Sequence, residues 1–273
     1  MVRVPNCIMI GLAVIIGEAI ALGKIPPLSN SLAGFLTASL MMAGTMVLND
    51  IYDLKIDRLN SPNRPLASGK IGLGEAKTFS TFLSILSIVF AAFLGLWTAL
   101  IALLALALMI YYNTRGKRTG LPGNLVVSFN VALPFFYGGI AVNSLRPLLF
   151  IFSVLAFLAN LGREIAKGIP DTQGDRASGV RTIAVLHGPK VAAGISAGLF
   201  LSAALLSFVP LALGRLSLLY FPGIFLADLG FVYSASRLIA NQDPESVKRI
   251  KNRVLLWMLF GLIGFLLGGV VNF

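Results

Sequence analysis

Residues 78–114 contain no Asp, Glu, Lys or Arg: TFSTFLSILSIVFAAFLGLWTALIALLALALMIYYNT. As one α-helix these 37 residues would extend for about 56 Å, whereas the hydrocarbon core of a bilayer is about 30 Å thick. The stretch therefore predicts two membrane-spanning helices joined by a turn near Gly95. The whole chain is similar in character, because 57% of its residues are hydrophobic and only 12% are charged, whereas a soluble domain has about 25% charged residues. A multispanning membrane protein is expected.

Nine spans of about 20 mostly apolar residues fit the chain. They cover approximately residues 4–23, 25–49, 78–95, 97–114, 119–141, 146–165, 191–212, 216–236 and 254–273. The first is interpreted as a span rather than a cleaved signal sequence, because no clear small-residue cleavage site follows it. The predicted fold class is thus an all-α membrane protein, in which residues 1–273 form a single bundle of nine transmembrane helices.

The basic residues predict the orientation. With the N-terminus in the cytoplasm, 19 of the 22 Lys and Arg residues fall on the cytoplasmic side, and only Lys24, Arg146 and Arg215 fall outside. This asymmetry is the positive-inside pattern of membrane proteins. The net charge of +11 is therefore a topology signal, and no nucleic-acid partner is expected. The single cysteine, Cys7, leaves no disulfide framework and no cysteine metal site.

Three carboxylates follow the second span within nine residues, in Asn49-Asp50-Ile51-Tyr52-Asp53-Leu54-Lys55-Ile56-Asp57. On one helix they would share a narrow face, because Asp53 and Asp57 lie about 60° and about 20° from Asp50. Like charges on one helix face repel. A hard divalent cation with oxygen ligands is the natural partner of such a face.

A second acidic cluster, Asp171 and Asp175, follows the sixth span. The two clusters are four spans apart, so both emerge on the same side of the membrane. This spacing predicts two similarly oriented four-helix halves plus a ninth helix. One acidic cluster is often only a solvated loop, but two at matching positions among basic residues favour Mg²⁺ and a diphosphate ligand.

Several segments resemble the UbiA-type intramembrane prenyltransferases. Residues Asn49–Asp57 are similar to the family's NDxxDxxxD signature, and Asn63–Lys70 to its RPLASG element. Residues 171–175, followed by Ser178-Gly179-Val180-Arg181-Thr182, resemble its second acidic motif, and Lys117–Asn124 also fits. The resemblance implies a nine-helix bundle, Mg²⁺ as cofactor and prenyl transfer from an allylic diphosphate. One position departs from the pattern, because Gly168 stands where many members have a further Asp.

The resemblance also implies residue roles. Five carboxylates are expected to hold metal: Asp50, Asp53 and Asp57 at one Mg²⁺, and Asp171 and Asp175 at another. Four of these, Asp50, Asp53, Asp171 and Asp175, are expected to be catalytic together with Lys167. Four side chains are expected to support the metal site or contact the diphosphate: Asn49, Arg64, Lys117 and Arg181. No general base is apparent.

The acceptor is less closely specified. The sequence around residues 51–57 and 116–120 is most similar to archaeal family members that transfer a geranylgeranyl group to the free hydroxyl of geranylgeranylglyceryl phosphate. Spare cations for the acceptor's phosphate are expected among Arg115, Arg118, Arg181 and Lys190. The alternative is an aromatic acceptor of the 4-hydroxybenzoate or naphthoate type in quinone biosynthesis, and a membrane transporter is a more distant alternative. The expected location is the cell membrane, with the active site facing the cytoplasm; the oligomeric state is open.

Two acidic residues lie inside predicted spans. Asp228 either pairs with a polar group in the bundle or lines a cavity, since an unpaired carboxylate is costly at membrane depth. Glu18 is similar and is expected near the outer surface. His187 precedes Gly188-Pro189 and is expected to be a loop residue rather than a catalytic one.

Overall fold

The structure, a computed structural model, describes residues 1–177, 179–212 and 216–270. No strand occurs in these residues, and nine helices among them are long and apolar enough to cross a membrane. These are α1 (Val4–Leu22), α2 (Leu28–Tyr52), α4 (Leu73–Leu94), α5 (Leu96–Thr114), α6 (Leu121–Ala141), α7 (Pro147–Lys167), α10 (Pro189–Leu206, continued by α11), α12 (Tyr220–Ala240) and α13 (Pro244–Val270). The prediction of nine spanning helices is confirmed.

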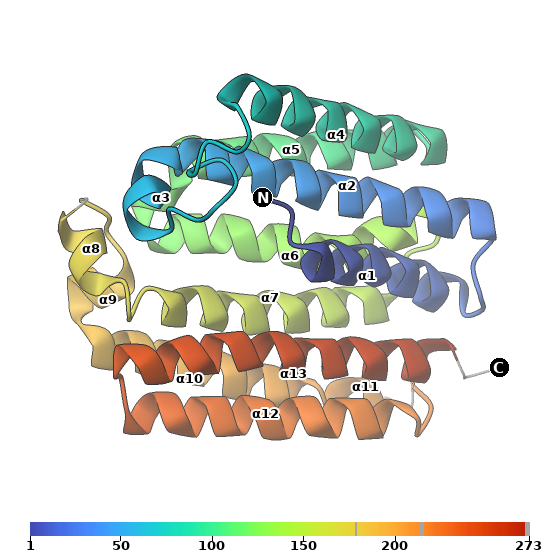
Figure 1. The fold of residues 1–273 in the computed structure, drawn as a ribbon. Helices are drawn as coiled ribbons and strands as arrows, with labels where there is room; N and C mark the ends of the chain where they lie inside the picture. The colour runs from blue at the N-terminus through green and yellow to red at the C-terminus, as the bar shows by residue number, and fades with distance from the viewer. Residues whose placement is uncertain (178, 213–215, 271–273) are drawn as a thin grey trace.

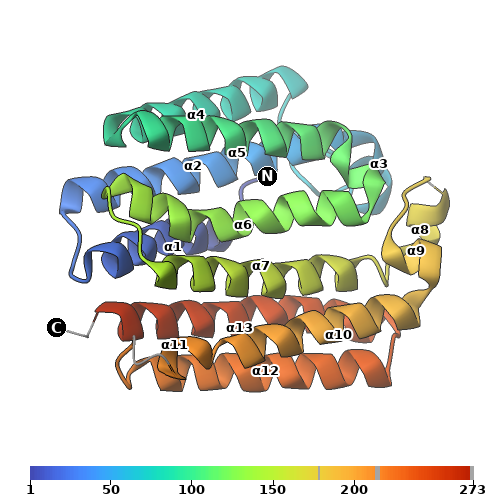
Figure 2. The same cartoon turned by 180° about the vertical axis from the view of Figure 1, so that it is seen from behind.

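Five short helices complete the described chain: α3 (Leu54–Asn60), the 3₁₀ helix η1 (Gly116–Thr119), α8 (Thr172–Ala177), α9 (Ile183–His187) and α11 (Val209–Ala212). Figures 1 and 2 show that α3, α8 and α9 lie together at one end of the bundle, the left end in Figure 1. The two acidic motifs, which adjoin α3 and α8, therefore lie at the same end of the molecule.

The helix bounds differ most from the predicted spans at α4, at α13 and in the seventh span. The turn at Gly95 is as predicted, with φ of 137° between α4 and α5. However, α4 begins at Leu73 rather than at 78, and α13 begins at Pro244 rather than at 254, because charged first turns extend both helices beyond their apolar parts. The seventh span is not one helix, since α10 ends at Leu206 and α11 follows. Residues 271–273 of the ninth span, and Arg215, lie outside the described residues.

The nine long helices form a closed ring. Each packs on the next in chain order, from α1 on α2 to α12 on α13, and α13 packs back on α1. Apolar side chains of α4 and α5 point outward, for example Phe82, Phe93 and Trp97, as expected for surfaces in contact with lipid. Inside the ring, Phe135, Phe152 and Phe265 belong to one buried cluster in which the rings of Phe152 and Phe265 stack. The ring thus encloses a space between its two sides.

Two glycines allow α1 and α6 to approach each other closely. A Cβ at Gly17 would collide with the carbonyl group of Phe135, and a Cβ at Gly138 would collide with the backbone of Val14. Small residues commonly permit such close approach between membrane helices. The contact holds α1 against α6, and other residues of α1 line the cavity described below.

Candidate active site

The first acidic motif lies where α2 ends. The prediction of one continuous helix through Asn49–Asp57 is wrong, because α2 ends at Tyr52, Asp53 is outside both helices, and α3 begins at Leu54. Aspartate is favoured at helix ends, where its short side chain competes with the helical backbone. The backbone still turns in helical fashion, since the amide of Asp57 donates to the carbonyl of Asp53 over 2.8 Å. The motif therefore remains compact although the helix is interrupted.

Two basic side chains neutralise much of the charge of this motif. The guanidinium Nη1 of Arg64 lies 2.6 Å from Asp57 Oδ2 and 3.5 Å from Asp50 Oδ1. Asp50 and Asp57 are buried, so a cation close to them offsets much of the cost of burying charge. The Nζ of Lys117 lies 2.7 and 2.8 Å from the two carboxylate oxygens of Asp53, and it donates to Asn49 Oδ1 over 2.6 Å.

Lys117 belongs to η1, which lies between α5 and α6. Burial lowers the pKa of its ammonium group, while the hydrogen bond and charge of Asp53 oppose that shift. The loop is fixed by Gly120, whose φ is 73° and which has no room for a Cβ because the carbonyl of Arg181 lies against it. The amide of Arg181 also donates to the carbonyl of Arg118 over 3.3 Å. The Lys117 loop and the segment after the second acidic motif are therefore joined through their backbones.

The second acidic motif follows α7. Gly168, at the C-terminal end of α7, has φ of −71° and ψ of −14°, so its backbone conformation does not require glycine. Asp171 is exposed just before α8, and the amide of Asp175 donates to its carbonyl over 2.8 Å. Burial, together with the neighbouring charge of Asp171, raises the pKa of Asp175 to about 6. Ser178, the first residue of the following family element, lies outside the described residues.

The motifs form no complete metal cage. Among the described residues, no group of three His, Cys, Asp or Glu side chains comes together in a way that could hold a metal ion. This is compatible with Mg²⁺, which is usually bound by one or two carboxylates, waters and the phosphate oxygens of a substrate. Carboxylates and the amide oxygen of Asn49 are the hard oxygen donors that such an ion prefers. The side chains at this end of the bundle therefore fit Mg²⁺, with the substrate as a further ligand.

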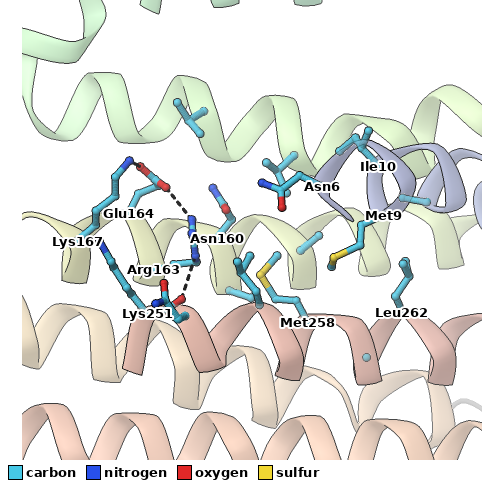
Figure 3. A pocket seen from close by; sticks show the side chains of 18 of the residues that line it. Asn6, Met9, Ile10, Asn160, Arg163, Glu164, Lys167, Lys251, Met258 and Leu262 are labelled. Atoms are coloured by element: carbon cyan, nitrogen blue, oxygen red, sulfur yellow. Dashed lines mark hydrogen bonds and ion pairs between the residues drawn. The ribbon is translucent and has the colours of Figure 1, made fainter. Parts of the chain in front are cut away.

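A cavity of about 570 Å³ occupies the space within the ring and reaches both motifs. Its polar part is lined by Arg3, Asn6, Asn49, Asp53, Arg64, Asn160, Arg163, Glu164, Lys167, Asp171, Lys251 and Asn252. Its apolar part is lined mainly by aromatic and aliphatic side chains, including Phe135, Leu155, Phe231, Met258, Leu262 and Phe265. In Figure 3, Lys167, Glu164, Arg163 and Lys251 lie at one end and Met9, Met258 and Leu262 toward the other. The cavity is thus suited to a ligand with an anionic head and an apolar tail.

The predicted site residues divide between the cavity wall and its surroundings. Five line the cavity: Asn49, Asp53, Arg64, Lys167 and Asp171. The others, Asp50, Asp57, Lys117, Asp175 and Arg181, do not line it, although all except Asp175 and Arg181 are bonded to a residue that does. The cations expected to bind the acceptor's phosphate, Arg115, Arg118, Arg181 and Lys190, are all exposed and none lines the cavity; their role stays a prediction.

Four charged residues of the cavity wall were not predicted as site residues: Arg3, Arg163, Glu164 and Lys251. Glu164 is buried and accepts from Arg163 Nη1 over 3.0 Å and from Lys167 Nζ over 3.2 Å. The sequence does contain a signal for the charged residues of α7, because Arg163, Glu164 and Lys167 come together at the end of an apolar span. No sequence signal indicated Lys251, because hydropathy placed it before the start of the ninth span.

The two acidic residues inside the spans have different surroundings. Asp228 both accepts a hydrogen bond from Ser207 Oγ, over 2.7 Å, and lines the apolar part of the cavity. Ser207 is the residue at which α10 ends. Glu18 is buried against α2 and accepts from Ser31 Oγ over 3.2 Å, away from the cavity. Exposed His187 lies at the end of α9 and is not part of the cavity wall.

A second, almost wholly apolar cavity of about 160 Å³ lies beside the first, between α1, α2, α5 and α6. The two cavities share four lining residues: Ile10, Met42, Val127 and Val131. These four side chains separate the two cavities. The main cavity therefore adjoins further apolar space that could hold hydrocarbon.

Comparison with known proteins agrees with this geometry. Residues 10–269 match the UbiA prenyltransferase family. The chain belongs to the UbiA prenyltransferase family. A digeranylgeranylglyceryl phosphate synthase of Sulfurisphaera tokodaii is 34% identical over 98% of this chain and 96% of its own length. The chain is therefore a prenyltransferase, which confirms the function predicted from its motifs.

Solved structures of UbiA proteins have the same fold. A structure of a digeranylgeranylglyceryl phosphate synthase is 31% identical, with a TM-score of 0.79 over 98% of this chain and 95% of that one. A UbiA homolog of Archaeoglobus fulgidus bound to GPP and Mg²⁺ is 19% identical, with a TM-score of 0.70 over 96% of this chain and 97% of that one. The second likeness concerns the fold alone.

Proposed function

We propose that this UbiA prenyltransferase transfers a geranylgeranyl group from geranylgeranyl diphosphate to the free hydroxyl of geranylgeranylglyceryl phosphate, forming an archaeal ether lipid. The cavity carries the proposal: its charged end adjoins two acidic motifs, and the rest of it offers apolar walls to long isoprenoid chains. The near-full-length relatives named digeranylgeranylglyceryl phosphate synthase support this acceptor.

We propose that the carboxylates hold Mg²⁺: Asp50, Asp53 and Asp57 at one ion, and Asp171 and Asp175 at another. When bound, Mg²⁺ neutralises negative charge on the diphosphate and so stabilises it as a leaving group. Asn49 supports the first ion or contacts the diphosphate. The Mg²⁺- and GPP-bound homolog of A. fulgidus supports metal dependence, and the oxygen donors described above suit the ion.

The cations at the charged end stabilise the leaving group. Lys167, Arg64, Lys117 and Arg181 are proposed to donate hydrogen bonds to diphosphate oxygens. Arg64 and Lys117 are bonded to the Asp residues of the first motif, so they are already held where the diphosphate's charge would be. Charge placed in advance around a developing anion is usually the largest contribution to catalysis.

The transfer then needs few protein groups. The bond between the allylic carbon and the diphosphate oxygen breaks, and its electron pair leaves with the diphosphate. Breaking that bond leaves an allylic carbocation. The acceptor's hydroxyl oxygen forms the ether bond to the allylic carbon, and its proton passes to an oxygen of the released diphosphate. Apolar side chains such as Phe135, Leu155 and Phe265 exclude water, which would otherwise react with the carbocation.

We further propose that the enzyme lies in the cell membrane with its N-terminus and charged cavity end in the cytoplasm. The distribution of Lys and Arg supports this orientation. The halves would be α1, α2, α4 and α5, followed by α6, α7, α10 and α12, with α13 closing the ring. Transport, the distant alternative, finds no support, because the chain belongs to a transferase family.

An acceptor panel tests the proposed function. Purified protein is mixed with Mg²⁺ and geranylgeranyl diphosphate, and diphosphate release and prenylated product are measured. We expect release only with geranylgeranylglyceryl phosphate, with 4-hydroxybenzoate and a naphthoate as the competing acceptors. Transfer to an aromatic acid but not to the glycerol phosphate lipid would refute the proposed acceptor. Diphosphate release without any acceptor would show that the protein hydrolyses the donor, and it would refute the proposal that release requires transfer.

A further inference from the structure

A pair of cations lies on the α7–α13 side of the cavity, and the roles described above use neither of them. Arg163 lies on α7, one helical turn from Lys167, and Lys251 lies on α13. Arg163 Nε donates to the backbone carbonyl of Lys251 over 3.2 Å, which ties the two helices together at this point. Figure 3 shows both side chains beside Glu164 and Lys167 at the charged end of the cavity. Arg163 and Lys251 are called the α7–α13 cation pair below.

The charge around this pair is unbalanced. Glu164 is the carboxylate of this wall, and it already binds both Arg163 and Lys167. Lys251 is half-buried and forms no ion pair with a carboxylate in the part of the chain that the structure describes. Three cations, Arg163, Lys167 and Lys251, therefore face the cavity beside two carboxylates, the buried Glu164 and the exposed Asp171 that follows α7. A partly buried excess of positive charge with free ammonium hydrogens suits an anion of about two negative charges.

The pair lies on a different wall from the first acidic motif. Asp53 and its partner Lys117 belong to the end of α2 and to η1, whereas Arg163 and Lys251 belong to α7 and α13. No hydrogen bond or ion pair in the described residues joins the two groups directly. Lys167, at the end of α7, and Asp171, just after it, line the same cavity. The charged end thus has room for two anionic groups, each with its own set of partners.

We propose that the α7–α13 cation pair binds the phosphate monoester of the acceptor lipid, separately from the diphosphate of the donor. This inference rests on the proposed function, which supplies an acceptor with such a group. Binding the phosphate on the α7–α13 wall directs the glycerol hydroxyl across the cavity toward the donor at the first acidic motif. The pair therefore selects phosphorylated acceptors over neutral alcohols, and it does so without Mg²⁺.

Steady-state kinetics of Lys251→Met test the proposal. Methionine keeps the length and apolar part of the side chain but removes the charge and the donors. A hydrogen bond to a charged group is worth about tenfold to a hundredfold in binding, so the KM for geranylgeranylglyceryl phosphate is expected to rise by that factor. The KM for geranylgeranyl diphosphate is expected to stay within about twofold, and Lys251→Arg to recover most of the acceptor affinity.

Lys248→Met is the matched control. Lys248 lies one turn earlier on α13, is exposed, pairs with Glu245 and does not line the cavity. Lys248 and Lys251 both count among the basic residues on the predicted cytoplasmic side. Because only Lys251 lines the cavity, Lys248→Met is expected to leave both KM values unchanged. A neutral acceptor, geranylgeranylglycerol, gives a second comparison: its slow transfer should be equal in the parent enzyme and Lys251→Met, because neither makes a phosphate contact with it.

Binding without turnover separates the proposal from the proposed function. In EDTA and without donor, the parent protein is expected to bind geranylgeranylglyceryl phosphate, and Lys251→Met to bind it at least tenfold more weakly, about the smaller factor given above. An increase in the KM for the donor instead would assign the pair to the diphosphate and overturn the proposal. Unchanged acceptor binding and kinetics in Lys251→Met would show that the α7–α13 cation pair does not bind the acceptor's phosphate, and would overturn the proposal. Transfer to the lipid by the parent enzyme would still support the proposed function.

Discussion

The contact between Lys117 and Asp53 shows how single residues prepare this site for an anion. Burial lowers the pKa of Lys117, the charge and hydrogen bond of Asp53 oppose that shift, and hydrogen bonds to Asp53 and Asn49 hold the side chain in place. An ammonium group that is held in place loses little freedom when a phosphate oxygen arrives. Its contribution to diphosphate binding should therefore be large for one side chain.

Substitution of Lys117 by Met tests that contribution. The KM for geranylgeranyl diphosphate is expected to rise by about tenfold to a hundredfold, the cost of one charge-assisted hydrogen bond. The KM for the acceptor should change little. Arg118→Met is the control, because Arg118 is the next residue, has an exposed side chain and, unlike Lys117, does not bond to Asn49 or Asp53 of the cavity wall. Equal effects of the two substitutions on the donor KM would contradict a specific role of Lys117.

The proposed metal ligands are tested by Asp50→Ala and Asp53→Ala. Each is expected to lower kcat by at least about a hundredfold, the loss typical of a principal electrostatic stabiliser, while the protein still purifies as a folded, monodisperse species. Glu245→Ala is the matched control, since it removes an exposed carboxylate at the start of α13. Full activity of both Asp variants would rule out a metal site at the first motif.

At this scale the sequence predicted the acidic motifs but not their partners. Carboxylates after a span are visible as a break in hydropathy, and the family motifs then assign their roles. The cation pair of Arg163 and Lys251 depends on α7 and α13 packing side by side, and no spacing along the chain encodes that contact. Likewise, the expected acceptor cations were chosen for being unassigned, and the structure places them at exposed positions outside the cavity wall.

Among the elements, α1 and α6 make the contact that most depends on small side chains. Gly138→Ala would press a methyl group against the backbone of Val14 and Glu18, and backbone cannot move aside as a flexible side chain can. Overpacking of this kind typically costs about 1–3 kcal/mol. We expect a lower melting temperature in detergent, whereas Gly198→Ala on α10 should cause no loss, because that position has open space around it. An unchanged melting temperature for Gly138→Ala would show that α1 can shift without cost.

The helices themselves were largely predictable, and their interruptions were not. The length of each apolar stretch predicts a spanning helix, and Gly95 predicts the turn between α4 and α5. The break at Asp53 and the end of α10 at Ser207 occur where a polar side chain interacts beyond its own helix, with Lys117 and with Asp228 respectively. Such breaks depend on tertiary partners. The charged first turns of α4 and α13 were missed because hydropathy detects apolar content rather than helix.

On the scale of the whole molecule, the closed ring is what brings the two acidic motifs to one cavity. Counting spans predicted that both motifs share one side of the membrane. It did not predict the order of helices around the ring, which places α1 between α2 and α13 and so lets residues of the first and last helices line the same space. The packing of distant segments follows from shape complementarity between helix faces, and a single sequence carries little information about it.

Removal of Mg²⁺ should stop catalysis without unfolding the protein. Arg64 and Lys117 already neutralise the first motif, so the folded state does not need the ion to offset carboxylate repulsion. EDTA is therefore expected to abolish transfer while the melting temperature changes by no more than a few degrees, and added Mg²⁺ should restore activity. Unfolding in EDTA would show that the metal also holds the bundle together.

The orientation of the bundle can be tested with single cysteines in a Cys7→Ala background. Cys7 is buried, and its removal leaves each introduced cysteine as the one thiol of the chain. Lys248 and Lys24 are both exposed and lie on opposite predicted sides of the membrane. With the N-terminus in the cytoplasm, a membrane-impermeant maleimide should label Lys24→Cys in intact cells and Lys248→Cys only in inverted vesicles. The opposite result would place the charged end of the cavity outside the cell. Its substrates would then have to be supplied from that side of the membrane.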